Sequence, residues 1–257
     1  MVKKRIIPKF LIRGGRLVKA VQFFDNFREA GNAVSTARVY DSYGVDEMIF
    51  LDIDATPKNK SIDCSIIERV SEEIFMPFTV GGGVRSIRDI ESLLEAGADK
   101  VSINSAAIEI PGFISEAASR FGDQCIVVSI DYRADSNGIF TFSRGGNERS
   151  NLDPVDWALK MEQEGAGEIM MTSIDRDGMM DGYDLDMINN LSNQLTKPLI
   201  ASSGAGNLSH CHAALDAGAS AVTVSSMFIF TDNSPIKVRT YLADRGVNVR
   251  NQTGSLS

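Results

Sequence analysis

The sequence predicts a single α/β domain, a (β/α)8 (TIM) barrel built from two similar half-barrels. The length of 257 residues is typical of one such barrel. Short β-rich runs alternate with helix-length segments along the chain, which favours a parallel sheet. Segments of the first half recur in the second, and an open doubly wound sheet, the alternative, would not explain two equal halves. We therefore expect one barrel domain over residues 1–257.

The internal repeat has a constant offset of 121 positions. The paired segments are 44–54 with 165–175, 77–83 with 198–204, and 95–105 with 216–226. Self-similarity at one fixed spacing indicates two copies of a structural unit. Each copy would supply half of the strands and helices of the barrel.

The eight strands and several of the helices can be placed from this pattern. Strands are expected near 5–11, 47–53, 77–81, 99–104, 125–131, 168–174, 198–202 and 220–225. Helix-length segments between them include 34–43, 86–96, 153–164 and 207–217. Three of these begin with Ser86, Asp153 and Asn207, residue types that favour a helix N-cap.

Composition excludes several classes of protein. The formal net charge of −8 is unlike that of a nucleic-acid binder, and it means that local geometry must hold any anionic ligand. The chain has no apolar run long enough to span a membrane, and residues 1–7 lack a signal-peptide pattern, so we expect a cytoplasmic protein that binds no membrane. Cys64, Cys125 and Cys211 are widely spaced and odd in number. This pattern predicts reduced thiols and no disulfide framework.

No metal site and no nucleophilic catalytic set is expected. His210 and His212 flank Cys211, but residues two apart on a helix do not face each other. The sequence also offers no arrangement of cysteine, histidine and carboxylate typical of nucleophilic catalysis.

Two loop clusters at symmetry-related positions predict two phosphate cradles. In such barrels the site lies on loops that follow the carboxyl ends of the strands. Glycines let backbone N–H groups approach an anion, and hydroxyl groups complete the cradle. The candidates are Gly82, Gly83, Asn104 and Ser105 in the first half, and Asp177, Gly178, Ser203, Gly204, Ser225 and Ser226 in the second. The alternative is that the glycines serve only tight turns.

Acid–base chemistry between the cradles would use Asp131, which ends the fifth strand. Its counterpart in the first half is Leu11, so one half has the acid and the other lacks it. Lys9 shares the face of Leu11 and is either a buried cation, with Asp131 as a candidate partner, or a residue at the solvated rim. Lys19, in the loop that begins at Gly14, either reaches a phosphate or is merely solvated.

The opposite end of the barrel carries four charges of mixed sign. Arg5, Glu47, Lys100 and Glu168 stand at the amino ends of four expected strands. Four such charges can form a closed salt-bridged ring under the barrel core. Taken by itself, this ring is a stabilising ion network or an interface, and it implies no chemistry.

Five motifs stand out along the chain, namely KRII at 4–7, FTVGGG at 78–83, ADKVSIN at 98–104, TSIDRDG at 172–178 and GVNVR at 246–250. Together they resemble the HisF family, the cyclase (synthase) subunits of imidazole glycerol phosphate synthase in histidine biosynthesis. The resemblance implies a phosphorylated substrate, no cofactor, and ammonia supplied by a glutaminase subunit, HisH. It also implies that Arg5, Glu47, Lys100 and Glu168 form an ammonia gate, and that Asp99 contacts the glutaminase.

The first strand departs from the family pattern, because Leu11 replaces the essential family aspartate. Loss of a general acid or base costs about 100-fold to 10,000-fold in rate. The chain is similar to HisF-like paralogues of bacterial surface-polysaccharide gene clusters, which are thought to serve acetamidino-sugar synthesis. Three functions stay open: a synthase subunit outside histidine synthesis, a working histidine-pathway cyclase with the acid replaced, and a catalytically silent ammonia channel.

Overall fold

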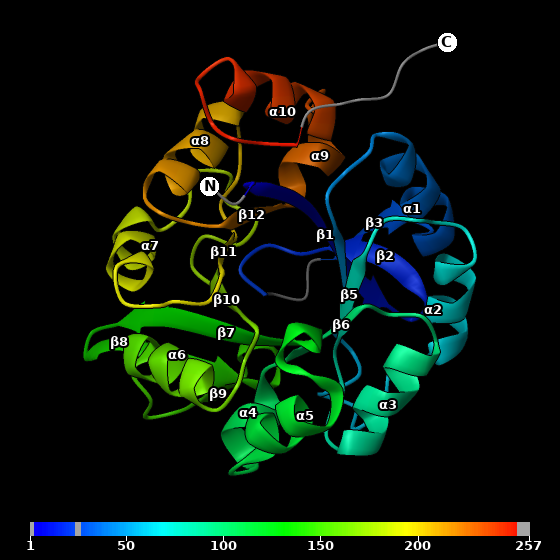
Figure 1. Ribbon diagram of the computed structural model, residues 1–257, viewed down its shortest axis with the longest axis vertical. Helices are drawn as coiled ribbons and strands as arrows, with labels where there is room; N and C mark the ends of the chain where they lie inside the picture. The colour runs from blue at the N-terminus through cyan, green and yellow to red at the C-terminus, as the bar shows by residue number, and fades with distance from the viewer. Residues whose placement is uncertain (1–2, 24–26, 251–257) are drawn as a thin grey trace.

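Eight parallel strands close a barrel in the computed structural model, which describes residues 3–23 and 27–250 (Figure 1). They are β1 (Arg5–Arg13), β4 (Met48–Asp52), β5 (Phe78–Gly81), β6 (Lys100–Ile103), β7 (Ile126–Asp135), β10 (Glu168–Ser173), β11 (Leu199–Ser202) and β12 (Ala221–Val224). The strands neighbour one another in chain order, β12 pairs with β1, and the pairing of β7 with β10 completes the closure. The predicted fold class is confirmed, and every predicted strand overlaps one of these eight.

Helices form the outer layer around the strands (Figure 1). They are α1 (Ala33–Ser42), α2 (Cys64–Ser71), α3 (Ile87–Glu95), α5 (Phe113–Phe121), α6 (Pro154–Gln163), α7 (Leu185–Ser192), α8 (Leu208–Asp216) and α10 (Pro235–Ala243), with the short α4 (Ser105–Glu109) and α9 (Ser226–Phe230) after β6 and β12. The predicted N-caps are confirmed, since the side chains of Ser86, Asp153 and Asn207 each accept a backbone N–H of the first helical turn. Within 3–23 and 27–250, no helix is long and apolar enough to cross a membrane.

The first strand of each half continues into an antiparallel excursion. After β1 the chain forms β2 (Arg16–Lys19) and β3 (Arg28–Gly31), and after β7 it forms β8 (Gly138–Ser143) and β9 (Glu148–Arg149). Two 3-10 turns, Asp123–Cys125 and Arg144–Gly146, flank β7 and β8. The sequence did not predict these added strands, and it placed Lys19 in a loop.

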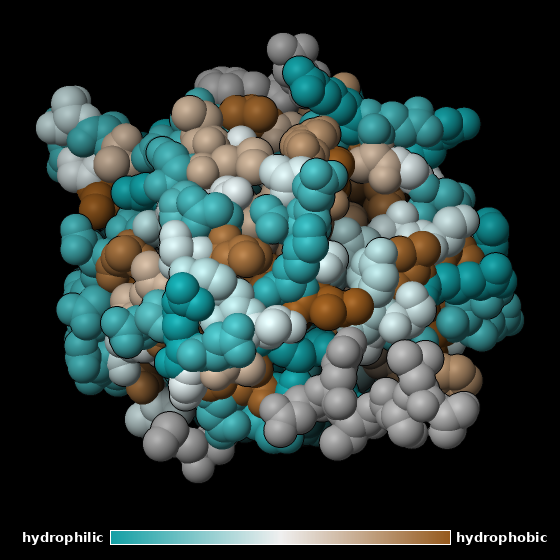
Figure 2. Space-filling view, turned by 90° about the horizontal axis from the view of Figure 1, so that it is seen from above, coloured by the Kyte–Doolittle hydropathy of each residue, from teal (hydrophilic) through white to brown (hydrophobic). Residues whose placement is uncertain are grey.

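The barrel interior is layered because alternate strand residues point inward. Ile7, Ile49, Val127, Met170, Ile200 and Ala221 form a separate buried apolar cluster inside the barrel. Outward-facing residues such as Phe10 and Phe50 pack instead into the larger core between strands and helices. Seen from the side of α8 and α10, the outer surface is mostly hydrophilic with scattered apolar side chains (Figure 2). The interior cluster therefore separates the two polar ends of the barrel.

Candidate active site

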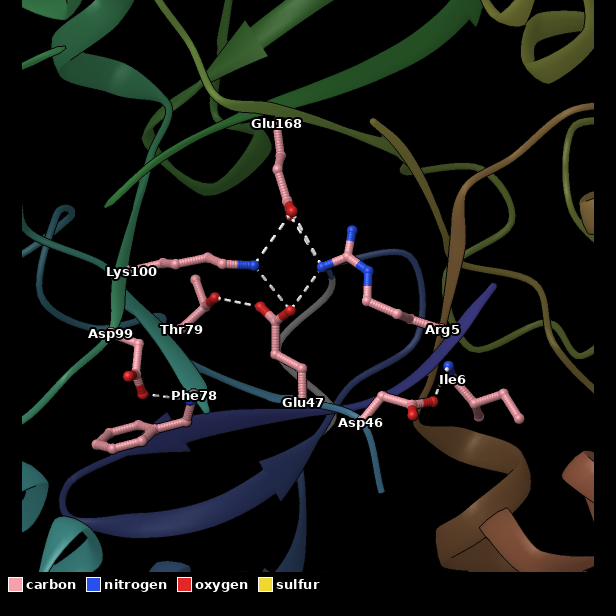
Figure 3. Close-up of polar contacts among 9 residues, drawn as sticks. All are labelled: Arg5, Ile6, Asp46, Glu47, Phe78, Thr79, Asp99, Lys100 and Glu168. Carbon is pink, nitrogen blue, oxygen red and sulfur yellow. Dashed lines mark hydrogen bonds and ion pairs between the residues drawn. The ribbon is translucent and has the colours of Figure 1, made fainter. Parts of the chain in front are cut away.

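The amino end of the barrel carries a closed ring of four ion pairs (Figure 3). Arg5 Nη1 lies 2.7 Å from Glu47 Oε2 and 3.0 Å from Glu168 Oε1. Lys100 Nζ lies 2.9 Å from the same Glu47 oxygen and 3.1 Å from the same Glu168 oxygen. Each charge thus contacts two of opposite sign, and the predicted ring is present.

The ring is fixed by neighbouring polar contacts. Thr79 Oγ1 donates to Glu47 Oε1 at 2.6 Å, so this buried carboxylate is bound on both oxygens. Asp46 Oδ2 accepts the backbone N–H of Ile6 at 3.1 Å, and Asp99 Oδ2 accepts that of Phe78 at 2.9 Å (Figure 3). Asp99 is itself exposed. Its carboxylate caps the start of β5, and its expected contact with a glutaminase stays a prediction.

The carboxyl end of the barrel holds a cavity of about 450 Å³. Its walls include the four residues predicted for the first cradle, namely Gly82, Gly83, Asn104 and Ser105, together with the catalytic candidates Lys9 and Asp131 and one second-cradle residue, Asp177. A second, narrower hollow adjoins it, because Lys9 and Asp177 line both. The second hollow is lined by the remaining candidates, namely Lys19, Gly178, Ser203, Gly204, Ser225 and Ser226. The structure therefore gathers both predicted cradles at one mouth.

Glycine is required at both cradles by close backbone approach. A Cβ on Gly82, at φ +103°, would lie 2.1 Å from the carbonyl oxygen of Asp52. A Cβ on Gly204, at φ +104°, would lie 2.0 Å from the carbonyl oxygen of Gly182. Ser203, the counterpart of Gly82, keeps a side chain at φ +80°, where non-glycine residues are strained. The tight-turn role is thus present, and it does not exclude anion binding.

Asn104 and Ser225 repeat the same unusual backbone conformation at the ends of β6 and β12. Their φ, ψ angles are −123°, −78° and −130°, −79°. Ser225 Oγ and Asn104 Oδ1 are buried, and neither has a hydrogen-bond partner within the described part of the chain. Buried polar atoms are normally hydrogen-bonded, so an unpaired hydroxyl at the second hollow indicates room for a ligand acceptor.

The carboxyl of Asp131 lies within this cavity wall and is held by two side chains. Asn104 Nδ2 donates to Oδ2 at 2.8 Å, and Ser129 Oγ lies 3.5 Å from Oδ1. Burial raises the pKa of Asp131 from 3.8 to about 6, against the opposing charge of Lys9. A carboxyl that titrates near neutral pH can both accept and donate a proton. Leu11 lines the same cavity with an apolar side chain, so no second acid stands at the equivalent place.

The two lysines are both buried, which decides between the alternatives. Lys9 is 4% exposed, so the alternative that placed it at the solvated rim is wrong. Its Nζ donates to Ser202 Oγ at 2.6 Å, so Ser202 and not Asp131 is its hydrogen-bond partner. Lys19 is 3% exposed on β2, so the expectation of a solvated lysine was also wrong. Its Nζ lies 2.9 and 3.1 Å from the two carboxylate oxygens of Asp177.

Sequence reasoning missed Asp52, Ser202 and Thr172. Asp52 ends β4 and lines the cavity, and its Oδ1 accepts the backbone N–H groups of Asp54 and Ala55. Burial raises its pKa. A carboxylate at a strand end, the criterion that selected Asp131, would have found it. Thr172 lines the cavity, and its buried hydroxyl has no hydrogen-bond partner within the described residues. The contact of Ser202 with Lys9 joins two distant strands, so only the fold shows it.

The histidine pair lies outside this region, on α8. His210 Nδ1 accepts the backbone N–H of Gly206, 3.2 Å away, and Asn207 contacts its other ring nitrogen. Within the described ranges, no three or more potential ligand residues gather to hold a metal ion. The thiols of Cys64, Cys125 and Cys211 are free. The His210 side chain thus binds backbone and side-chain groups at the start of its own helix.

One comparison with known proteins bears on this geometry. A sequence model of the family described as "Histidine biosynthesis protein" matches residues 5–234. The match covers most of the chain, including all eight barrel strands and every candidate residue named above.

Proposed function

The chain belongs to the histidine biosynthesis protein family, and from this premise we propose that it is an ammonia-using synthase subunit. Members of this family are isomerase or cyclase enzymes on this barrel. In the proposal, ammonia enters through the charged ring and reacts with a phosphorylated substrate in the cavity at the other end. The substrate lies outside histidine synthesis, in the synthesis of acetamidino sugars for surface polysaccharide.

The order of the layers along the barrel axis carries this proposal. A charged ring closes one end, an apolar cluster fills the middle, and a polar cavity opens at the other end. Ammonia is small and uncharged, so an apolar interior can pass it while rejecting ions that would have to lose their water. The ring is closed by four ion pairs, so in this proposal it must open for ammonia to pass.

The proposed ammonia source is a HisH-like glutaminase docked on the ring face. The side chains of Arg5 and Lys100 are 21% and 18% exposed there, so a docked partner can reach and rearrange them. Asp99 is exposed beside Lys100 and would contact the partner. The ring is an ion network in either case, and its retention at a family-specific place favours the gate over a purely stabilising role.

The two cradles support a substrate with phosphate at each end, or a nucleotide-linked one. Gly82 and Gly83 face the larger cavity, while Gly204 and the unpaired hydroxyl of Ser225 face the smaller hollow. Such anchors would fix the middle of the substrate beside Asp131. The apolar Leu11 in the same wall argues against the histidine-pathway reaction, which in the family depends on an aspartate at this position.

Turnover of the histidine-pathway bisphosphate, phosphoribulosyl-formimino-aminoimidazole carboxamide ribotide, tests this assignment. The assay uses saturating ammonium salt, which bypasses the glutaminase. We expect no turnover by the wild type and measurable turnover by Leu11→Asp. Wild-type turnover near that of a working cyclase would overturn the assignment and identify a histidine enzyme.

The gate is tested separately with the HisH-like glutaminase encoded nearest this gene. We expect it to bind the chain and to be stimulated by it, and Glu168→Gln to weaken that stimulation. Glu73→Gln, which breaks the exposed ion pair with Arg38, is the matched control and should leave both binding and stimulation of the glutaminase unchanged. A glutaminase that neither binds nor responds would refute the ammonia-supply role.

A further inference from the structure

We propose that Lys9 is a nucleophile that forms an imine with the carbonyl carbon of a phosphorylated ketone or aldehyde. This inference goes beyond the acetamidino-sugar assignment, whose reacting carbonyl would be an amide, and it rests on the phosphate cradles and the ammonia route of the proposed function. The amine would be covalently joined to the substrate for part of the reaction.

The position of Lys9 is the first argument. Its side chain is 4% exposed, yet it lines both the larger cavity and the adjoining hollow. Lys9 lies two residues after Ile7 on β1, and Ser202 lies two after Ile200 on β11, so their hydrogen bond stands one layer above the apolar cluster. The amine therefore sits where the barrel interior opens into the cavity.

The partners of Lys9 are the second argument. Its Nζ contacts the neutral hydroxyl of Ser202, and within the described residues it takes part in no ion pair. The carboxylate of Asp177 is bound on both oxygens by Lys19, and that of Asp131 is bound by Asn104. Lysines held only for stability at such depth are normally paired with a carboxylate.

The charges around Lys9 favour its neutral, nucleophilic form. Burial lowers the pKa of Lys9, Asp177 and Asp131 oppose this, and the Lys19 ammonium lowers it further. These groups come from β1, β2, β7 and the loop after β10. A desolvated lysine beside a second cation is a recognised arrangement for imine chemistry.

The chemistry balances without an oxidant or reductant. The nitrogen lone pair of Lys9 attacks the carbonyl carbon, and a proton moves from that nitrogen to the carbonyl oxygen, which gives a carbinolamine. Asp131 in its protonated form donates a proton to the departing hydroxyl, water leaves, and a protonated imine remains. Ammonia that arrives through the barrel adds to the same carbon and gives a gem-diamine. A proton moves from the ammonia-derived nitrogen to the Lys9 nitrogen, the bond between carbon and Lys9 breaks, and Lys9 leaves as a neutral amine while the substrate carbon remains as a protonated imine of ammonia.

Reductive trapping on the wild-type chain tests the imine. Ribulose 1,5-bisphosphate is the probe, since it has a ketone between two phosphates, and sodium cyanoborohydride reduces any imine to a stable secondary amine. Peptide mapping by mass spectrometry locates the adduct. Burial lowers the pKa of Lys9, which favours its neutral, nucleophilic form. We therefore expect Lys9 to be labelled ahead of the exposed lysines.

Two variants and one ligand complete the design. Lys9→Met should abolish the label, and Lys4→Met, which removes another partly desolvated lysine at the ring end, should leave it unchanged. Binding of the carbonyl-free ribitol 1,5-bisphosphate, measured by calorimetry, reports on the cradles alone. Binding without labelling of Lys9 would overturn the imine and leave the proposed function intact. Failure of both bisphosphates to bind would overturn the phosphate cradles and the imine with them.

Discussion

Replacement of Asp131 by asparagine is expected to stabilise the fold above pH 6, although it removes the leading acid–base group. The carboxyl pKa rises from 3.8 to about 6 when the chain folds, because burial disfavours the charged form. Between these values the folded state binds more protons than the unfolded state. Stability from this group is therefore fully present below pH 3.8 and is lost as the pH rises through about 6.

The expected gain follows from that difference. A pKa raised from 3.8 to about 6 corresponds to about 3 kcal/mol of stability lost at neutral pH, as an upper value. Asparagine is neutral at every pH and keeps an oxygen that can accept the N–H of Asn104, as the carboxylate does at 2.8 Å. Asp131→Asn should thus approach wild-type stability near pH 4 and exceed it by at most about 3 kcal/mol above pH 6.

Urea unfolding at a series of pH values from 4 to 8 measures this difference directly. Asp232→Asn, at an exposed site, is the matched control and should change stability by less than about 0.5 kcal/mol. Equal stability of Asp131→Asn and wild type at every pH would refute the reasoning, as would destabilisation of the variant above pH 6. Either result would mean that Asp131 is solvated, or better paired, in the folded chain.

Three further substitutions test other parts of the structure. Glu47→Gln removes a buried charge that holds both cations of the ring, and it should lower the free energy of unfolding by about 3 kcal/mol in urea. Gly82→Ala meets a carbonyl oxygen at 2.1 Å and should destabilise far more than Gly14→Ala, where no atom lies within 4 Å. Ser203→Gly relieves a left-handed φ worth about 1 kcal/mol or more, but it should weaken phosphate binding measured by calorimetry.

The repeat predicted the barrel strands well because the same pattern of strands and turns occurs in each half. The antiparallel strands after β1 and β7 were not predicted because they are short, and β3, with the sequence REAG, has no apolar alternation. Those missed strands explain why Lys19 was placed in a loop.

The candidate site was predictable to the level of residue type and strand end. Its pairings were not, because they join distant parts of the chain. The partners Lys9 and Ser202 are 193 positions apart, and Lys19 and Asp177 are 158 apart. Asp52 ends β4 as Asp131 lies on β7, so its strand-end position alone would have predicted it. Which side chain each buried lysine contacts depends on the barrel closure, and a linear pattern does not contain it.

The ion-pair ring has a consequence for how the two halves recognise each other. Glu47 and Glu168 are repeat counterparts, but Arg5 and Lys100 both belong to the first half. At the ring, the first half therefore carries an excess positive charge and the second half a single negative one. Two copies of the first half would bring together four cations and two carboxylates, and two copies of the second would leave two carboxylates unpaired. Separated halves should consequently prefer the unlike partner over their own copies.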